Sequence, residues 1–317
     1  MASYFLGVDG GQSSTTAMVG DENGRVLGLG RGGPCNHVGA AEGRAKFTRV
    51  IRECVGKACA QAGLEQSSFR FAAACLGFSG GPADKQAILE EILPTERLAV
   101  TTDALIALSG ATAGEPGIIT IAGTGSIAFG RNTAGKTARA GGWGYVFGDE
   151  GGAFDVVRQS LRAALRYEEG WGPPTVLRRV LLEATGAPDA NDLLHRFYTT
   201  EYSRPHIASY AALVDQAAVE GDAVAGRLLE NAAQELASIA AAVRGQLFDR
   251  NESARVSYIG GVFRSGILLE RFRMLVELEE GNRCGPPVYG PAAGALIEAY
   301  RNAGLAPKIT NLPEAEK

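Results

Sequence analysis

The sequence lacks several features that would place it in a special class of protein. It contains no run of 18 or more apolar residues, so no membrane span is predicted. Its first residues, Met1 to Tyr4, are not a basic segment followed by an apolar run, so no secretory signal is predicted and we expect a cytoplasmic protein. With 31 basic and 35 acidic residues, the net charge is −4. This balance gives no electrostatic reason to expect nucleic acid as a partner.

Cysteine and proline are also scarce. The five cysteines are odd in number and include no Cys-x-x-Cys pair, which argues against a disulfide framework and against a zinc ribbon. We therefore expect reduced thiols that behave as small buried hydrophobic side chains. The 13 prolines and the hydrophobic content of 45% argue against a disordered linker.

Glycine, in contrast, is abundant. The chain has 43 glycines in 317 residues, about twice the usual frequency of roughly 7%, and no triplet repeat of the collagen kind. Residues 7–39 contain 10 of them and residues 114–152 contain 12, so half of the glycine lies in less than a quarter of the chain. Such clusters indicate backbone that needs conformational freedom or that approaches a ligand closely.

Apolar runs bounded by turn residues predict two similar units of strands. The strands of the first unit are expected at residues 4–9, 15–19, 25–29, 71–76 and 98–101, with helices at 40–62 and 84–92 and a short helix that begins after Asp103. The second unit repeats the pattern about 110 residues later, with strands at 117–121, 126–131, 136–140 and 255–259. Residues 153–250 are predicted to be almost wholly helical, with further helices at 265–279 and 291–302.

The repeat predicts two domains of an α/β protein. We place the N-terminal domain at residues 1–113 and the C-terminal domain at residues 114–317. The last helix, at about 291–303, could pack back on the N-terminal domain.

One pattern must be set aside. Residues 130–137 fit the P-loop pattern Gly-x-x-x-x-Gly-Lys-Thr, which binds phosphate only where a helix begins at the lysine. Residues 137–152 contain six glycines, and each costs a helix about 1 kcal/mol relative to alanine. The segment is therefore predicted to be a hairpin turn with Lys136 facing solvent.

Two other glycine loops are better candidates for phosphate binding. In each unit the first strand runs into such a loop, Gly10-Gly11 in the first and Gly123-Thr124-Gly125 in the second. Glycine lets backbone amides approach phosphate oxygens, and Asp9 at the strand end could hold Mg²⁺ through water. An ordinary glycine turn would explain the first loop alone at least as well; the pair of loops favours a polyphosphate held from both sides.

These segments resemble those of a known superfamily, the sugar kinase/heat-shock 70/actin group, and more closely its N-acetylglucosamine kinase family of BadF/BadG/BcrA/BcrD-type ATPases. The segments that carry the resemblance follow the family order and span most of the chain: Gly7-Val-Asp-Gly-Gly-Gln-Ser-Ser-Thr15, Cys35-Asn36-His37, Gly77-Phe-Ser-Gly-Gly81, Thr102-Asp103-Ala104, Ile121-Ala-Gly-Thr-Gly-Ser126, Gly141-Gly-Trp-Gly-Tyr-Val-Phe-Gly-Asp-Glu-Gly-Gly152, Glu220-Gly221-Asp222 and Ile259-Gly260-Gly261-Val262. The block from residue 141 to 152 is the most specific of them.

The resemblance implies a fold, a reaction and a set of ligands. The fold would be a two-domain actin-like ATPase (ribonuclease H-like) fold, with duplicated β-sheet cores flanked by helices and an interdomain cleft. The protein would transfer the γ-phosphate of ATP, with Mg²⁺, to the C6 hydroxyl of N-acetylglucosamine or a related amino sugar such as glucosamine, N-acetylmannosamine or N-acetylmuramic acid. A homodimer is implied by the resemblance alone.

Carried over by position, the resemblance assigns roles to individual residues. Asp103 would be the general base, although an aspartate that precedes a helix is equally typical of an N-cap. The sugar contacts would be Asn36, His37, Gly80, Asp103, Gly142, Trp143, Gly144 and Asp149. Other interpretations are a solvated loop histidine for His37, a core tryptophan for Trp143, and helix-terminal capping for Asp149 and Glu150.

The nucleotide contacts implied by the resemblance come from both units. They are Gly10, Gly11, Gln12, Ser13, Thr15, Thr124, Gly125, Gly221, Gly260 and Gly261, with Asp9 as the metal-binding residue through water. Gly221 would equally suit a turn between helices. Gln12 departs from the small residue that many family members have there, which puts the γ-phosphate contact at that position in doubt.

Two other functions remain as alternatives. The first is an activator ATPase of a 2-hydroxyacyl-CoA dehydratase or benzoyl-CoA reductase type of system, which would need closely placed cysteines for an iron–sulfur cluster. Cys54 and Cys59 lie within a predicted helix and Cys284 is isolated, which does not favour it. The second is an actin-like assembly or regulator without enzymatic activity.

Overall fold

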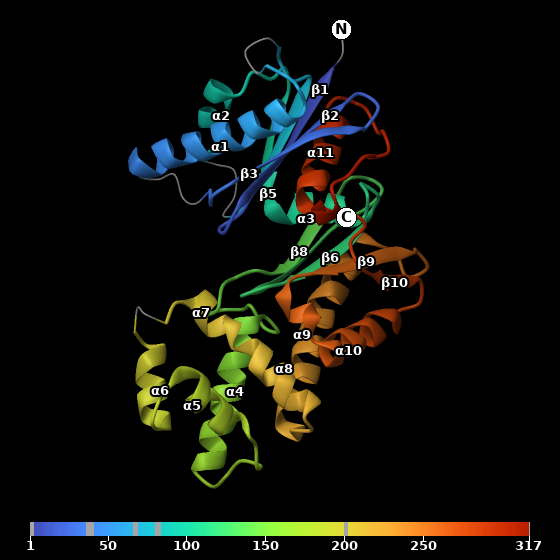
Figure 1. Cartoon of the computed structure of the whole chain (residues 1–317). Coiled ribbons are helices and arrows are strands. Elements are labelled where there is room, and N and C mark those ends of the chain that lie inside the picture. The colour runs from blue at the N-terminus through green and yellow to red at the C-terminus, as the bar shows by residue number, and fades with distance from the viewer. Residues whose placement is uncertain (1–2, 36–40, 66–68, 80–83, 200–201, 317) are drawn as a thin grey trace. The chain divides into compact units, whose positions relative to one another are not determined.

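The computed structural model describes residues 3–35, 41–65, 69–79, 84–199 and 202–316, and divides the chain into two compact units (Figure 1). Unit 1 consists of residues 1–116 and 287–317, and unit 2 of residues 117–286. Each unit is built around one five-stranded mixed sheet. Across the described residues, none of the helices is both long and apolar enough to cross a membrane.

The sheet of unit 1 has the strand order β3-β2-β1-β4-β5. Its strands are β1 (Tyr4–Gly10), β2 (Thr15–Asp21), β3 (Val26–Gly32), β4 (Ala73–Phe78) and β5 (Leu98–Thr102). The first three strands pair antiparallel, whereas β1, β4 and β5 run parallel. The three parallel strands therefore end at the same edge of the sheet.

The sheet of unit 2 has the order β10-β9-β6-β7-β8. Its strands are β6 (Gly117–Ala122), β7 (Ser126–Arg131), β8 (Thr137–Gly141), β9 (Ala254–Ile259) and β10 (Asn282–Gly285). Here β6, β7 and β8 pair antiparallel, and β6, β9 and β10 run parallel. Counted from the first strand of each unit, both sheets have the same order and the same directions, so the predicted duplication of the β-units is confirmed.

Helices cover both faces of the first sheet (Figure 1). The helices of unit 1 are α1 (Ala41–Gln61), α2 (Gln86–Ile92), α3 (Asp103–Ala111) and α11 (Pro291–Asn302), followed by the short η3 (Glu314–Glu316). Helix α1 packs Phe47 and Ile51 into a core with the Leu6 side of β1. On the other face, α11 packs Leu296 against Phe5 of the same strand. The alternation of Phe5 and Leu6 explains why β1 needs a helix on each side.

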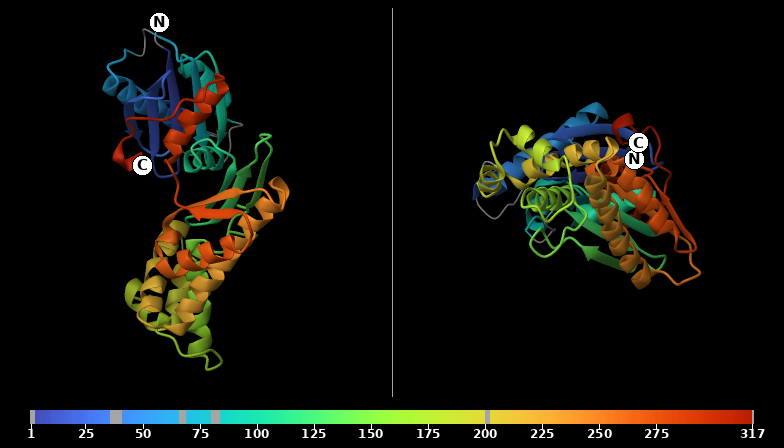
Figure 2. Two further views of the ribbon diagram at one scale, coloured as in Figure 1. Left: turned by 90° about the vertical axis from the view of Figure 1, so that its right-hand side faces the viewer. Right: turned by 90° about the horizontal axis from the view of Figure 1, so that it is seen from below.

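The helices of unit 2 lie mostly between β8 and β9 along the chain. They are α4 (Ala153–Glu168), α5 (Leu177–Thr185), α6 (Ala190–Phe197), α7 (Arg204–Ser209), α8 (Ala211–Val219) and α9 (Ala223–Leu247), with η2 (Gly261–Arg264) and α10 (Gly266–Glu277) after β9. Helices α9 and α10, orange in Figure 2, lie side by side and share a core with strands β6 and β9 through Leu236, Phe272 and Ile118.

The predicted strands and the predicted helix-rich region are confirmed within a few residues at their ends. The short strand β10 was not predicted, because four residues with a glycine at the end carry little periodic signal. The P-loop pattern lies in the β7–β8 hairpin, as predicted, and Lys136 is exposed with its ammonium donating to the carbonyl of Gln246 at 3.2 Å. No helix begins at that lysine.

Candidate active site

In unit 1, the ends of the parallel strands bring three polar side chains to one edge of the sheet. The register pairs Asp9 of β1 with Gly77 of β4, and Gly77 with Thr101 of β5. Asp9, Ser79 and Asp103 therefore all come at or just beyond the carboxyl ends of neighbouring strands. Ligands of open α/β sheets bind at such edges.

Asp103 is held by hydrogen bonds on both carboxylate oxygens. Oδ2 accepts a hydrogen bond from the hydroxyl of Ser79 at 2.7 Å, and Oδ1 accepts from the backbone N–H of Ala104 at 2.9 Å. The N-cap of α3 is Thr102, whose hydroxyl accepts from the backbone N–H of Leu105. The capping interpretation of Asp103 is therefore wrong: the neighbouring threonine has that role, and the aspartate is oriented by Ser79.

Asp9 lies in a crowded acidic environment. Its pKa is raised to about 7, chiefly by burial and to a smaller extent by the nearby carboxylates of Asp103 and Glu316. Glu316 is buried at the start of α11, where its carboxylate accepts from the backbone N–H of Ala292. A buried carboxyl with other carboxylates nearby is electrostatically suited to a cation.

The loop between β1 and β2 is a tight turn closed by the backbone. The N–H of Gly11 donates to the carbonyl of Ser14 at 2.9 Å, and Gln12 and Ser13 are exposed. A side chain at Gly10 would overlap the ring of Phe78, so only glycine fits there. Thr15 is fully buried, and its hydroxyl donates to the carbonyl of Gly33 at 2.7 Å. The Thr15 hydroxyl is therefore used in a buried hydrogen bond at the base of the loop, whereas Gln12 and Ser13 face solvent.

Three of the predicted sugar-contacting residues cannot be placed. Asn36, His37 and Gly80 lie outside the described residues. The sugar contacts of unit 1 that can be located are therefore limited to Asp103.

In unit 2, the glycine loop after β6 lies against the start of α4. The backbone N–H groups of Ala153 and Phe154 donate to the carbonyls of Gly123 and Thr124 at 2.8 and 3.1 Å. A Cβ atom at Gly125 would lie 2.5 Å from Cγ of Asp149, so a glycine is required where this carboxylate packs. The predicted phosphate loop and the predicted sugar loop of unit 2 are thus in direct contact.

Asp149 is the best-anchored polar residue of that loop. It is buried, and its positive φ of 64° is rare for a residue with a side chain. Oδ1 accepts from the backbone N–H of Ser126 at 3.3 Å, and Oδ2 pairs with the guanidinium of Arg204 at 3.1 Å. The N-cap of α4 is Gly152, without a side-chain capping bond, so the capping interpretation of Asp149 and Glu150 is wrong.

Trp143 is 64% exposed, and the Arg139 guanidinium lies 4.5 Å from its ring centroid. The interpretation of this residue as a core tryptophan is therefore wrong. Its neighbours Gly142 and Gly144 both have positive φ, which gives the loop the sharp turns that present the ring.

The remaining predicted nucleotide residues also lie in unit 2. Gly260 follows β9 and lies against the backbone of Ala122, the last residue of β6, so Gly260 and Gly261 share an edge with the loop at Gly123. Gly221 occupies the turn between α8 and α9, with a φ of 100°. This placement fits the alternative interpretation of Gly221 as a turn between helices.

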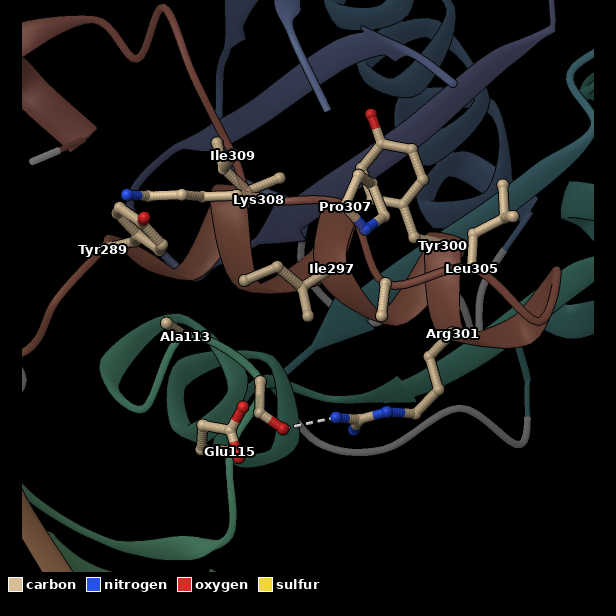
Figure 3. Close-up of a pocket in the computed structure, with 12 residues that line it drawn as sticks. Ala113, Glu115, Tyr289, Ile297, Tyr300, Arg301, Leu305, Pro307, Lys308 and Ile309 are labelled. Atoms are coloured by element: carbon tan, nitrogen blue, oxygen red, sulfur yellow. Dashed lines mark hydrogen bonds between the residues drawn. The ribbon is translucent and has the colours of Figure 1, made fainter. Parts of the chain in front are cut away.

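The cavity drawn in Figure 3 lies elsewhere in unit 1. It has a volume of about 290 Å³ and lies between α11 and the segment that follows it, where Arg301 donates to the carbonyl of Gly114. It is lined by none of the residues predicted to contact nucleotide or sugar. Within the described ranges, no three or more His, Cys, Asp or Glu side chains are grouped so that they could hold a metal ion.

Similarity to known proteins identifies the family and the fold of the chain. The sequence matches the BadF/BadG/BcrA/BcrD ATPase family over residues 6–299. The N-acetylmuramic acid/N-acetylglucosamine kinase of Clostridium acetobutylicum is 32% identical over 281 residues, which cover 87% of this chain and 90% of the relative. The N-acetyl-D-glucosamine kinase of Dictyostelium discoideum is 31% identical over 83% of this chain and 87% of the relative.

A solved structure from Chromobacterium violaceum, provisionally named an N-acetylglucosamine kinase, is also similar. It is 27% identical, with a TM-score of 0.71 over 93% of this chain and 98% of that chain. The predicted α/β fold, with its duplicated sheets, is therefore confirmed as that of the actin-like sugar kinases. The chain belongs to the BadF/BadG/BcrA/BcrD ATPase family.

Proposed function

We propose that the protein is an ATP-dependent kinase that phosphorylates the C6 hydroxyl of N-acetylglucosamine or a closely related amino sugar. The single observation that carries the proposal is the carboxylate of Asp103, which lies at the edge of the parallel strands and is oriented by Ser79 rather than used as a cap. The relatives named as amino-sugar kinases support the choice of substrate class.

In this mechanism, Asp103 orients the attacking hydroxyl and accepts its proton. Phosphoryl transfer needs little covalent help from the protein, so positioning and proton acceptance are the main tasks of such a residue. Asp149, held by Arg204 and the backbone of Ser126, accepts hydrogen bonds from sugar hydroxyls. The exposed ring of Trp143 offers a flat apolar face to the sugar ring.

The residues present fit ATP and Mg²⁺. Asp9, crowded by two other carboxylates, is suited to hold a cation through water, and the turn at Gly10 and Gly11 leaves its backbone bare for phosphate oxygens. Gly123 to Gly125 and Gly260 to Gly261 would hold the rest of the nucleotide, with Gly221 as a further contact. When bound, the nucleotide and its cation supply the phosphoryl group and neutralise its charge.

The activator-ATPase alternative finds no support in the cysteines. All five are buried and unpaired. Burial raises the pKa of the Cys54 and Cys284 thiols to about 12, which disfavours the thiolate form that an iron–sulfur cluster requires. We keep the kinase as the one proposed function. The homodimer that the resemblance implies is its proposed assembly, and sedimentation velocity would measure the oligomeric state.

The direct test is release of ADP in a coupled assay with a panel of sugars. We expect turnover that depends on N-acetylglucosamine or another hexosamine and on Mg²⁺, with glucose as the control that lacks the amino group. If no hexosamine stimulates ADP release above the rate with ATP alone, the proposal is wrong.

A further inference from the structure

A cavity of about 500 Å³ lies in unit 2 and is lined in part by Arg204, the arginine that pairs with Asp149. Its walls come from the loop before α4 and from helices α4, α6 and α7, and most of them are apolar or aromatic. Tyr145 and Phe154 form one side with their rings in edge-to-face contact at 5.3 Å, and Leu161 and Ile207 form the buried floor. Small-molecule sites typically have such apolar walls with a few fixed polar groups.

The polar groups of this cavity are two arginines. Arg158 and Arg204 line it, and no aspartate or glutamate does so within the part of the chain that the structure describes. Each arginine is fixed by a carboxylate that is not part of the lining: Arg158 pairs with Asp155 at 2.6 Å, and Arg204 pairs with Asp149 at 3.1 Å. Among the residues that the structure describes, the lining therefore has two positioned cations and no anion.

Both guanidinium groups retain unused donors. An arginine has five N–H groups, and among the described residues Arg204 makes one hydrogen bond and Arg158 makes two. Stacking also restrains Arg204, whose Cζ lies 4.5 Å from the Tyr145 ring centroid and 5.6 Å from that of Phe154. Unused donors on a restrained cation are suited to a planar anion such as a carboxylate.

Arg204 joins this cavity to the proposed sugar site. The same side chain lines the cavity and holds Oδ2 of Asp149, the residue that we propose binds sugar hydroxyls. We propose that the cavity is a subsite for a short, partly apolar substituent that ends in a carboxylate and is carried by the sugar, such as a carboxyethyl ether. The aromatic walls would pack against its alkyl part, and Arg158 would bind its carboxylate. This inference rests on the proposed amino-sugar kinase function.

The test compares two sugars that differ only in that group, N-acetylglucosamine and N-acetylmuramic acid. For wild type and Arg158→Gln, kcat/KM is measured with each sugar. We expect the variant to shift the ratio of the two values by about 10-fold or more against N-acetylmuramic acid, because a hydrogen bond to a charged group is lost. The control is Arg162→Gln, an exposed arginine of the same helix that does not line the cavity. An unchanged ratio in Arg158→Gln would overturn the proposal.

A charge pair at the rim gives a second test that does not depend on Arg158. Leu194 of α6 lines the cavity and is 36% exposed, so a polar side chain can be placed there without opening the core. For each variant, kcat/KM with N-acetylmuramic acid is divided by kcat/KM with N-acetylglucosamine. We expect Leu194→Glu to lower this ratio, because its carboxylate repels that of the sugar, and Leu194→Lys to raise it. Shifts of the same sign in both variants would contradict a carboxylate subsite.

Calorimetric binding of N-acetylmuramic acid without ATP separates this inference from the proposed function. Binding that weakens in Arg158→Gln, in a protein that phosphorylates no hexosamine, would support the subsite and reject the kinase. The opposite outcome is also distinguishable. If both sugars are phosphorylated, and if Arg158→Gln changes neither the affinity for N-acetylmuramic acid nor the ratio of the two kcat/KM values, the kinase is supported and the subsite is rejected.

Discussion

The hydroxyl of Ser79 lies 2.7 Å from Oδ2 of Asp103 and donates a hydrogen bond to it. Ser79 follows β4 and Asp103 follows β5, and these parallel strands are neighbours in the sheet. The contact fixes one carboxylate oxygen, and the backbone N–H of Ala104 fixes the other. The carboxylate therefore has a set orientation before any substrate arrives.

Replacing this carboxylate by an amide should abolish most of the catalysis and preserve the fold. We expect Asp103→Asn to lower kcat by at least about 10²-fold, the usual contribution of a general base. Because Thr102 caps α3, the helix should remain intact and the melting temperature should change little. Coupled ADP release and calorimetric ATP binding measure the two properties. Retention of wild-type turnover would reject Asp103 as the base.

The orienting hydroxyl should contribute less than the base itself. We expect Ser79→Ala to lower kcat by about 10-fold, in line with the loss of one hydrogen bond to a charged group. Ser238→Ala removes a hydroxyl from the exposed part of α9 and serves as the matched control. Steady-state kinetics measure kcat for both variants. Equal kcat values for the two would show that Asp103 does not depend on the Ser79 hydrogen bond.

The raised pKa of Asp9 predicts how the stability of the protein depends on pH. A carboxyl whose pKa is about 7 in the folded state and near its ordinary value in the unfolded chain stabilises the folded state at low pH. This contribution is complete below the ordinary pKa and is lost as the pH rises to about 7.

Asp9→Asn removes this dependence, so without Mg²⁺ the variant should become more stable than wild type as the pH rises from 4 to 7. The gain should be on the order of a few kcal/mol. Urea unfolding at several pH values measures it, with the exposed Glu235→Gln as the control. A difference between Asp9→Asn and wild type that is constant across this range would contradict the prediction.

Two glycines of one loop should differ sharply in their tolerance of a side chain. A Cβ at Gly125 would meet the carboxylate of Asp149, whereas a Cβ at Gly123 has no atom within 4 Å. Gly125→Ala should therefore destabilise the protein by about 1–3 kcal/mol and weaken sugar binding, and Gly123→Ala should do much less. Thermal unfolding and the KM for the sugar report the two effects. If both variants lose similar stability and sugar affinity, contact with Asp149 is not what requires glycine at position 125.

Much of the fold was predictable because strand patterns and glycine turns are local signals. Asp9 and Asp103 could be placed at one edge of a sheet because each comes at the carboxyl end of a predicted strand. The same rule would have found Ser79, which follows β4 in the equivalent position. Thr102 could have been recognised as the cap, because a hydroxyl that precedes a helix is as typical there as a carboxylate.

Contacts that depend on tertiary structure left no comparable signal. Arg204 pairs with Asp149 across 55 residues and lies in a helix of six residues, and Glu316 approaches Asp9 from almost the other end of the chain. The approach of a ligand also does not account for all of the clustered glycines. Gly30 lies against the Cys54 carbonyl of α1, so part of the enrichment in residues 7–39 serves close packing of a helix on a strand.

The division of unit 1 into residues 1–116 and 287–317 has a consequence for how the protein is made. On the ribosome, the strands of unit 1 emerge first, but α11, which covers the Phe5 side of β1, emerges only after the whole of unit 2. Synthesis of unit 1 therefore starts before that of unit 2 and ends after it. Until α11 has been synthesised, one apolar face of the unit 1 sheet stays uncovered. A truncated product that ends within unit 2 would carry the same uncovered face and be a target for chaperones and proteases.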